Sequence, residues 1–592
     1  MNSTHFYSDE KNTQILIALL KAHGIRDLIL SPGATNDSFV LSVQGDEYFN
    51  LYSAVDERHA GYLAVGMAEE TGNPVVINCT GATASRNYMP AMTEAYYRKL
   101  PILAVTSSQH SSHIGNMWPQ MTDRIHLPAD VATLSVQCPM PKTFEEIKDC
   151  ELKINRAILC LTWHGGGPVH INLETIGSRN FNVSELPETR VIKRFSLASE
   201  EMPSLPQNAK IAVWVGSHRP FNRDAVSALE SFVLANNAVV LGDLTSNYMG
   251  KGYVQGALVC SQRGRELNPA FAHLKPDLII HIGEISGDSP VGGFLRCCKV
   301  PVWRVSEDGE LRDYLMQLRA VFEMPEDRFF SYYATHNAGK GNYLEAWESV
   351  DKEIRSQMPD VAFSNLWLSQ QLSALIPQSA ELHLGILNSL RAWNLTNLQY
   401  RCVYSNVGGF GIDGCMSSLI GASLKNPSRL YFGVFGDLAF FYDLNSLGSR
   451  HIQKNIRILL VNNGEGGEFS IPGHISDVCG NRVHDFIAAK GHYGKKSPDL
   501  VKHIATDLGF KYMSASTKED FLSLVGQFVC EEITEPIIFE CFTDVAVERK
   551  ALADCRGIAP YEKYSFLGHG KARALIKRVT PPALAEFIRQ NI

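Results

Sequence analysis

The segment of residues 429–469 constrains the fold most, because it reads as a strand, a helix and a second strand in direct succession. The two strands are apolar, partly aromatic runs, and the helix follows a Gly-Asp break. We expect the strands over 430–435 and 456–461, and the helix over 439–449. Strands joined by such a crossover lie parallel and adjacent. The loops that follow them, at Asp437 and Asn463, are therefore predicted at one carboxyl edge of a sheet, where α/β folds bind ligands.

These two loops carry residues suited to a metal ion and a phosphate group. Asp437 offers a carboxylate and Asn463 an amide carbonyl, the hard oxygen ligands that Mg²⁺ prefers. Glycines at positions 436, 464, 466 and 467 let the backbone approach a diphosphate closely. Each residue also has a purely structural interpretation, Asp437 as a helix N-cap and 462–464 as a turn. The ordered pair on one crossover unit favours the metal site.

Composition and charge argue against several classes of function. The chain of 592 residues is long enough for three or more domains, and its formal net charge of −7 is not that of a nucleic-acid-binding protein. No uninterrupted apolar run reaches about 18 residues, and the polar first residues do not resemble a signal peptide. Thirteen cysteines without a C-x-x-C spacing suggest reduced thiols in a cytoplasmic protein. We therefore expect neither a nucleic acid nor a membrane as a partner.

Strand-like and helix-like segments alternate along the chain, which predicts an α/β protein with three doubly wound parallel-sheet domains. The domains are expected at 1–185, 195–350 and 360–555, followed by a C-terminal extension at 556–592 in which 581–590 reads as an amphipathic helix. Residues 186–195 read as a linker. The middle domain has no G-x-G-x-x-G and so carries no dinucleotide signature.

From Gly436 to Phe469 the pattern GDL…DLN…VNNxxGG…F resembles the cofactor-binding motif of thiamine-diphosphate enzymes, and most closely that of the MenD-like synthases. The resemblance implies thiamine diphosphate held with Mg²⁺, whose ligands are Asp437, Asn463 and the carbonyl of Glu465. It extends to the Gly-rich segment 406–422, where Ile412 is the apolar residue that supports the bent cofactor. The further cofactor contacts implied are Gly411, Asp413, Gly436, Leu438 and Gly466.

The segment that begins DERHAGYLAVGMAEETGNP at Asp56 resembles the pyrimidine-binding domain of the same superfamily. In that family the glutamate that opens the segment, here Glu57, hydrogen-bonds the aminopyrimidine and so activates the thiazolium carbon. Taken alone, Glu57 also fits a first-turn helix carboxylate. The resemblance implies pyrimidine-binding, central and diphosphate-binding domains, and a homodimer or homotetramer with active sites at subunit interfaces. It leans toward a central domain without flavin.

The arginines that MenD-like synthases use to bind substrate carboxylates are mostly replaced. Their expected positions fall on Thr35, Gln109, Trp393 and Val407, with Arg391 as a substitute for the third. Guanidinium groups match carboxylates bidentately. Four such replacements beside a retained cofactor motif predict a donor that is smaller or less charged than 2-oxoglutarate, with pyruvate as the first choice.

A segment at 114–123 resembles part of acetolactate synthases, in which a glutamine lies near the reacting carbon, so Gln120 is a second catalytic candidate. His110, His113, His474 and Glu468 are further acid/base candidates. For any one of these histidines, a surface or hydrogen-bonded structural role is the commoner case.

The sequence thus predicts an enzyme that uses thiamine diphosphate and Mg²⁺ to decarboxylate a 2-oxo acid donor and to join the remaining fragment to a carbonyl or enone acceptor. Three alternatives stay open: a decarboxylase or C–C lyase or hydrolase that forms no new bond, a synthase with the family's own substrates, and a catalytically silent binding subunit. The number of carbon atoms in the product distinguishes the first alternative from a synthase that forms a new bond. Consumption of isochorismate with 2-oxoglutarate would identify the second. Retention of Glu57, Ile412, Asp437 and Asn463 argues against the third, although fold alone would not.

Overall fold

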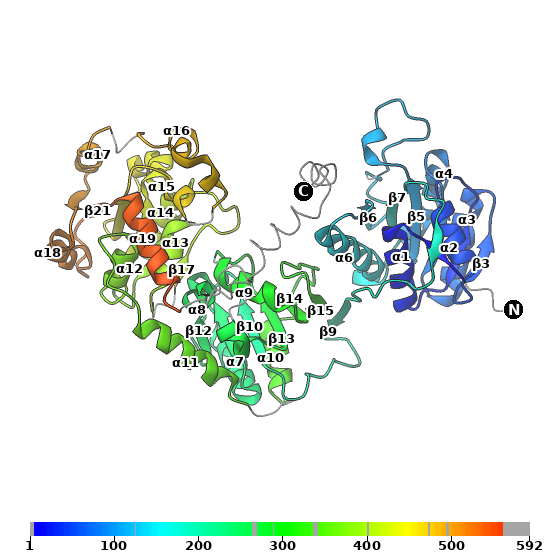
Figure 1. Ribbon diagram of the computed structural model, residues 1–592, viewed down its shortest axis with the longest axis horizontal. Coiled ribbons are helices and arrows are strands. Elements are labelled where there is room, and N and C mark those ends of the chain that lie inside the picture. The colour runs from blue at the N-terminus through cyan, green and yellow to red at the C-terminus, as the bar shows by residue number, and fades with distance from the viewer. Residues whose placement is uncertain are drawn as a thin grey trace, which may run out of the picture. The chain divides into compact units, whose positions relative to one another are not determined.

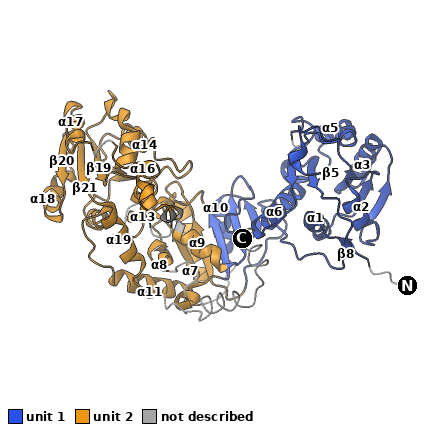
Figure 2. Ribbon diagram, turned by 45° about the horizontal axis from the view of Figure 1, so that its top comes forward, with its two compact units in different colours: residues 1–206, 277–282, 299–336 blue, residues 207–276, 283–298, 337–592 orange. Residues whose placement is uncertain are grey.

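The computed structural model describes residues 5–124, 126–262, 269–287, 289–335, 341–398, 402–471, 474–492 and 496–559. The chain divides into two compact units, coloured separately in Figure 2. Unit 1 comprises residues 1–206, 277–282 and 299–336, and unit 2 comprises residues 207–276, 283–298 and 337–592. The helix expected at 581–590 lies outside the described residues, and the domain boundaries drawn from the sequence stay predictions.

Unit 1 contains a six-stranded parallel sheet in the order β3-β2-β4-β5-β7-β6 (Figure 1). Its strands are β2 (Asp27–Leu30), β3 (Asn50–Ser53), β4 (Val75–Cys79), β5 (Ile102–Ser108), β6 (Leu134–Cys138) and β7 (Val169–Glu174). One face is covered by α1 (Lys11–Ala22), α2 (Asp37–Gln44) and α6 (Phe144–Cys160), and the other by α3 (Glu57–Thr71) and α5 (Met89–Arg98). Successive strand residues alternate between these faces, Leu28 packing with the first set of helices and Ile29 with the second.

Parallel strands also form the middle of the chain. In unit 2 these are β10 (Ile211–Val215), β11 (Val239–Gly242) and β12 (Tyr253–Gln255). In unit 1 they are β13 (Leu278–Ile282), β14 (Val302–Ser306), β15 (Leu318–Glu323) and β9 (Lys193–Ser196). The helices along this part are α7 (Arg223–Asn236), α9 (Ser289–Cys298), α10 (Glu326–Ala334) and α11 (Tyr343–Ser356). Because β9 begins inside the segment predicted as a linker, that segment is structured.

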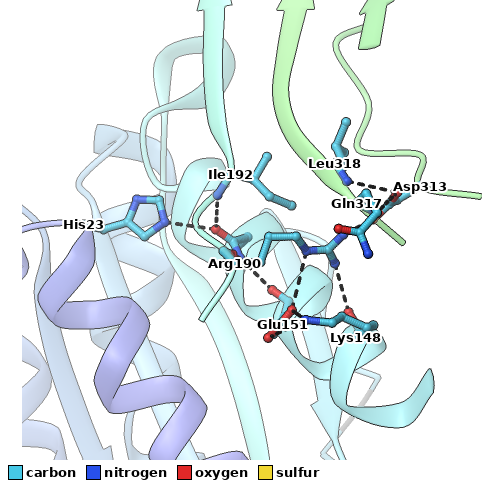
Figure 3. A network of polar contacts seen from close by, with 9 residues as sticks. His23, Lys148, Glu151, Arg190, Ile192, Asp313, Gln317 and Leu318 are labelled. Atoms are coloured by element: carbon cyan, nitrogen blue, oxygen red, sulfur yellow. Dashed lines mark hydrogen bonds and ion pairs between the residues drawn. The ribbon is translucent and has the colours of Figure 1, made fainter. Parts of the chain in front are cut away.

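Arg190 lies in the same segment and connects several parts of unit 1 (Figure 3). Its buried guanidinium forms ion pairs with Glu151 and Asp313. Its carbonyl accepts a hydrogen bond from Nδ2 of Asn155 at 2.8 Å, and Oδ1 of Asn155 lies 3.1 Å from Nε2 of His23. A buried guanidinium needs neighbouring carboxylates to offset its desolvation. The network therefore fixes the segment against α1 and α6.

Unit 2 contains a second six-stranded parallel sheet in the order β17-β16-β18-β19-β21-β20. Its strands are β16 (Glu381–Leu384), β17 (Val403–Tyr404), β18 (Tyr431–Gly436), β19 (Ile456–Asn462), β20 (Lys511–Ala515) and β21 (Ile537–Phe542). One face is covered by α14 (Cys415–Ser423), α15 (Asp437–Tyr442) and α17 (Leu500–Asp507). On the other, α12 (Asn365–Leu372) and α18 (Lys518–Phe528) pack through an aromatic cluster that joins Trp367, Phe521 and Phe539.

The crossover unit predicted from the sequence is present. The strands expected at 430–435 and 456–461 are β18 and β19, which pair in parallel as neighbours. The helix expected at 439–449 is divided into α15 and a 3-10 turn at Leu444–Gly448. Among the described residues the three large sheets are parallel, and an antiparallel pair joins only the short strands β1 (Tyr7–Ser8) and β8 (Phe181–Val183). The predicted α/β class with three parallel sheets is confirmed.

None of the helices in the described part of the chain combines the length and the apolar character needed to cross a bilayer.

Candidate active site

Asp437 stands at the carboxyl end of β18, as the first residue of α15. Only 5 % of the residue is exposed. Its Oδ2 accepts a hydrogen bond from the Gly464 amide at 2.8 Å, and its Oδ1 accepts one from the Leu438 amide at 2.9 Å. The loop after β19 is thus bonded directly to the residue that follows β18. The two loops meet as the crossover predicted.

Asn463 and Glu465 continue the second loop. Oδ1 of Asn463 accepts a hydrogen bond from the Glu465 amide at 3.2 Å, which closes a short turn. The Glu465 carboxylate is buried and lies 2.5 Å from Nδ1 of His484 and 3.8 Å from Nζ of Lys490. Because this side chain is already engaged, the main-chain carbonyl is the group through which Glu465 would reach a metal.

A cavity of about 440 Å³ opens at this edge of the second sheet. The residues of this unit predicted to contact the cofactor or its metal all line it: Gly411, Ile412, Asp413, Gly436, Asp437, Leu438, Asn463, Glu465 and Gly466. Ile412 also packs on the apolar core beneath. The volume is within the range of pockets that hold small molecules and cofactors.

The backbone around the cavity is shaped for close approach. Leu387 and Phe410 line it with left-handed φ angles of 70° and 55°, which cost free energy for residues with side chains. A Cβ at Gly467 would lie 2.8 Å from Nδ2 of Asn388, so a side chain there would displace that amide. A Cβ at Gly436 would meet no protein atom and would fill open space instead. Bare backbone beside a buried carboxylate and an amide oxygen fits a diphosphate with its cation.

Among the described residues, no group of three or more His, Cys, Asp or Glu side chains is arranged to hold a metal ion. The predicted ligand set contains only one such side chain, Asp437, beside an amide and a main-chain carbonyl. A set of this kind holds a hard cation only when a bound phosphate supplies further oxygens.

Glu57 lies in unit 1 as the first residue of α3 and is half-buried. The helix is capped by Asp56, whose Oδ1 accepts hydrogen bonds from the amides of Arg58 at 2.8 Å and His59 at 3.4 Å. With the cap supplied by its neighbour, the Glu57 carboxylate is not needed as the N-cap. Four large apolar side chains near it in the sequence are exposed, namely Tyr52, Val55, Tyr62 and Leu63.

Gln120 lies in the long loop after β5 and is exposed, with a left-handed φ of 64°. In the same loop the ring of His113 stacks on Trp118 at 4.0 Å. His110 is held by the Ser112 hydroxyl, 2.8 Å from its Nδ1. His474, in unit 2, has its Nδ1 2.6 Å from the Ser476 hydroxyl and does not line the described cavity. Each of the three histidines therefore has a stacking or hydrogen-bonding contact, as expected for a structural role.

Two of the residues that replace the expected arginines, Thr35 and Trp393, have structural contacts instead. Oγ1 of Thr35 lies within hydrogen-bonding distance of the Thr80 hydroxyl, and donates to the Ser107 carbonyl at 3.1 Å. Trp393 is fully buried in the core. Arg391 does line the cavity, where its guanidinium pairs with the Glu468 carboxylate.

Two carboxylates near the site, Glu540 fully buried and Glu548 half-buried, were not anticipated. Glu540, in the middle of β21, accepts hydrogen bonds from Nδ2 of Asn462 at 2.7 Å and from the Tyr512 hydroxyl at 2.8 Å, and burial raises its pKa. Glu548, on α19 (Val545–Arg556), lines the cavity, and burial raises its pKa to about 7. A charged residue inside the apolar strand IIFECF was the available sequence signal for the first.

The family model described as "Thiamine pyrophosphate enzyme, N-terminal TPP binding domain" matches residues 11–127. Relatives named 2-succinyl-5-enolpyruvyl-6-hydroxy-3-cyclohexene-1-carboxylate synthase are similar over nearly the whole chain. The one from Phocaeicola vulgatus is 32 % identical over 571 residues, covering 91 % of this chain and 96 % of its own length. Those from Bacteroides thetaiotaomicron and Bacteroides fragilis are 30 % and 29 % identical, and each covers 93 % of this chain.

Proposed function

Because the chain belongs to the thiamine-diphosphate enzyme family of these carboxylate synthases, we propose that it decarboxylates a 2-oxo acid of low charge and joins the remaining fragment to a carbonyl or enone acceptor. Its membership makes it a thiamine-diphosphate-dependent enzyme of the transferase or lyase type. The cofactor, when bound, supplies a carbon nucleophile and takes up the electron pair released as CO₂ leaves. The observation that carries the proposal is that Asp437, Asn463 and Ile412 line one and the same cavity.

The cavity residues are assigned to binding. Asp437, Asn463 and the Glu465 carbonyl hold Mg²⁺ on the diphosphate in this proposal. Two backbone amides already orient the Asp437 carboxylate, at 2.8 and 2.9 Å, so little reorganisation is needed when the cation arrives. Ile412 packs on the apolar core and lines the cavity, which supports its assignment as the apolar residue that would contact the cofactor.

Two residues of unit 1 are assigned to the chemical step. Glu57 holds a proton at the ring nitrogen of the pyrimidine, which requires a carboxylate free of helix-capping duty, as observed. Gln120 is exposed on its loop and offers an amide that can both donate and accept a hydrogen bond to the donor substrate.

The charge of the cavity supports a donor with little negative charge. Its lining contains two arginines, Arg391 and Arg549, against five carboxylates: Asp413, Asp437, Glu465, Glu468 and Glu548. A bound cation offsets part of this charge. A second carboxylate on the donor would meet more carboxylates than arginines in this lining, so pyruvate is the first donor to test.

Active sites shared between subunits are part of the proposal. The exposed apolar side chains Tyr52, Val55 and Tyr62 near Glu57 are typical of a protein interface, and Val55 is 78 % exposed. Co-expression of Glu57→Gln with Asp437→Ala tests this directly. If each site combines residues of two subunits, mixed dimers regain up to one fully native site, whereas sites within one subunit leave every dimer inactive.

The function is tested by incubating the purified protein with thiamine diphosphate, Mg²⁺ and a panel of 2-oxo acids and acceptor carbonyl compounds, following CO₂ release and product mass. Turnover of one acid to a longer product establishes ligation and names the donor. Release of the aldehyde alone in the presence of every acceptor contradicts the ligating step. Consumption of isochorismate with 2-oxoglutarate contradicts the assigned donor.

A further inference from the structure

An ion pair between Arg391 and Glu468 stands in the wall of the cavity, apart from the cofactor-binding residues. Arg391 belongs to α13 (Asn388–Trp393) and Glu468 to the turn Gly467–Ser470. Nη1 lies 2.6 Å from Oε2 and Nη2 lies 3.2 Å from Oε1, so the two planar groups meet through two contacts. The side chains are 17 % and 22 % exposed, and both line the cavity.

Neighbouring residues hold the pair in place. Nη1 of Arg391 also donates to Oδ1 of Asn388. The side-chain nitrogen Nδ2 of Asn388 occupies the space that a side chain at Gly467 would need. The Asn388 carbonyl accepts a hydrogen bond from Nδ2 of Asn365 at 3.2 Å. Because the pair is anchored through Asn388, an entering molecule meets it as a fixed surface.

The charges of this pair cancel, and this decides what it can recognise. A guanidinium presents its forked N–H groups to one carboxylate at a time, and here Glu468 occupies them. A distal carboxylate on a substrate would have to displace Glu468 and leave that charge without its partner in a half-buried place. Breaking such a pair is costly. A substrate with an uncharged side chain meets no such cost.

We propose that the Arg391–Glu468 pair is a specificity element by which the site selects 2-oxo acids with one carboxylate and rejects those with a second. This inference rests on the proposed function, in which the cavity receives the 2-oxo acid donor. Glu468 acts as a positioning residue, because it withholds the Arg391 guanidinium from a distal carboxylate. The pair thereby replaces the substrate-binding arginines that the sequence lacks with a neutral polar wall.

The test compares pyruvate with 2-oxoglutarate, which carries a second carboxylate, in wild type and three variants. Glu468→Gln keeps the shape and frees the guanidinium, so the kcat/KM ratio of 2-oxoglutarate to pyruvate is expected to rise at least about tenfold, since a released charge a few ångströms away is worth more than one decade. Arg391→Gln leaves the carboxylate alone and is expected to lower that ratio. Asp351→Asn releases the similarly half-buried Arg355 outside the cavity lining and is the matched control, with the ratio unchanged.

A second readout needs no turnover. Acetylphosphonate and succinylphosphonate are analogues of the two acids that cannot lose CO₂, and their binding to the protein loaded with thiamine diphosphate and Mg²⁺ gives the same ratio by calorimetry. If both analogues bind but neither variant of the pair moves the ratio, the inference is overturned and the proposed function stands. If wild type binds neither analogue and releases CO₂ from no 2-oxo acid, the proposed function itself is overturned.

Discussion

The sheet of unit 1 and the second sheet, in unit 2, have their strands in the same spatial order, with the second strand outermost and then the first, third, fourth, sixth and fifth. The residue directly after the third strand is Thr80 in unit 1 and Asp437 in unit 2. After the fourth strand it is Gln109 in unit 1 and Asn463 in unit 2. At the first of these equivalent positions unit 1 has a neutral hydroxyl and unit 2 a carboxylate, whereas the second position holds an amide side chain in both units.

The local consequences differ accordingly. In unit 1 the Thr80 hydroxyl contacts Thr35, and the edge is closed by hydrogen bonds between loops. In unit 2 the Asp437 carboxylate accepts hydrogen bonds from the backbone amides of Gly464 and Leu438, and a cavity of about 440 Å³ lies beside it. The shared fold supplies a carboxyl edge in both cases, and the residues in its loops decide whether that edge binds a charged ligand.

Replacing the residue after the third strand by alanine should have very different effects in the two units. The variant in unit 2 should show the largest loss of activity. Asp437→Ala removes the carboxylate that would offset the cation, so we expect loss of measurable cofactor affinity and a fall in kcat/KM on the order of 10⁴-fold. The matched variant at the equivalent position, Thr80→Ala, should change cofactor affinity less than about tenfold, the size of one lost hydrogen bond. Calorimetry with thiamine diphosphate and Mg²⁺ measures both, and equal effects would contradict the assigned difference between the edges.

The Glu57→Gln variant removes a negative charge from unit 1. The amide keeps the size of the side chain but cannot hold a proton in the same way, so kcat should fall about 10³-fold while cofactor affinity stays within a few-fold. Steady-state kinetics and calorimetry give the two quantities.

The control for that variant is Glu69→Gln, further along the same helix, where the carboxylate pairs with Arg98 at the surface. It should leave kcat unchanged. Full activity of Glu57→Gln would show that the carboxylate in unit 1 has no part in the reaction.

Much of this architecture could be predicted from local sequence. The strands at Asp27–Leu30, Ile211–Val215 and Leu278–Ile282 are short apolar runs between turns, a pattern that predicts buried strands. The edge strand β6 gives no such signal, because four of its five residues are only half-buried and form no continuous apolar run. For helix α6 the sequence does hold a signal, the capping box between Thr143 and Glu146.

The candidate site likewise contains residues that the sequence predicts and a contact that it does not. The cavity residues around Asp437 and Asn463 follow from strand order and loop chemistry, which a motif records. The pairing of Arg391 with Glu468 joins residues 77 positions apart, and depends on how α13 packs beside the turn at Gly467. Both residues drew attention singly, but no local pattern encodes their contact. Burial of Arg190 in a Pro-containing stretch was hidden for the same reason, since its partners come from distant segments.

In each unit one carboxylate also connects the first helix of the sheet with the segment after its last strand. The carboxylate precedes the helix in unit 1 and follows the strand in unit 2. In unit 1, Glu10 precedes α1 and accepts a hydrogen bond from the Thr175 hydroxyl at 2.8 Å. In unit 2, Glu548 follows β21 and its oxygens lie 2.9 and 3.0 Å from the amide of Asn365, the first residue of α12. Burial raises the pKa of Glu548 from its ordinary 4.5 to about 7.

Glu548→Gln should therefore alter how stability depends on pH. Because the folded-state pKa is raised, the carboxyl is protonated in both states below about pH 4.5, and the wild type loses stability as the pH rises from there to about 7. The loss amounts to at most about 3 kcal/mol, and the glutamine variant lacks it. Thermal unfolding midpoints from pH 4 to 9 should converge for the two proteins at acid pH and separate in favour of the variant above pH 7. Parallel pH profiles would contradict the raised pKa.

The smallest effect is expected at the hydroxyl network of unit 1. Oγ1 of Thr35 donates to the Ser107 carbonyl at 3.1 Å and accepts from the Gly81 amide at 3.4 Å. Thr35→Val keeps the shape and removes these bonds, which should destabilise the loop by about 1 kcal/mol and speed hydrogen exchange at Gly81 about fivefold. Thr35→Ser retains the hydroxyl and should exchange as the wild type does. Exchange at Gly464 should be unchanged in both variants, because each edge is stabilised by its own loops. Faster exchange at Gly464 in either variant would show that the two edges are coupled.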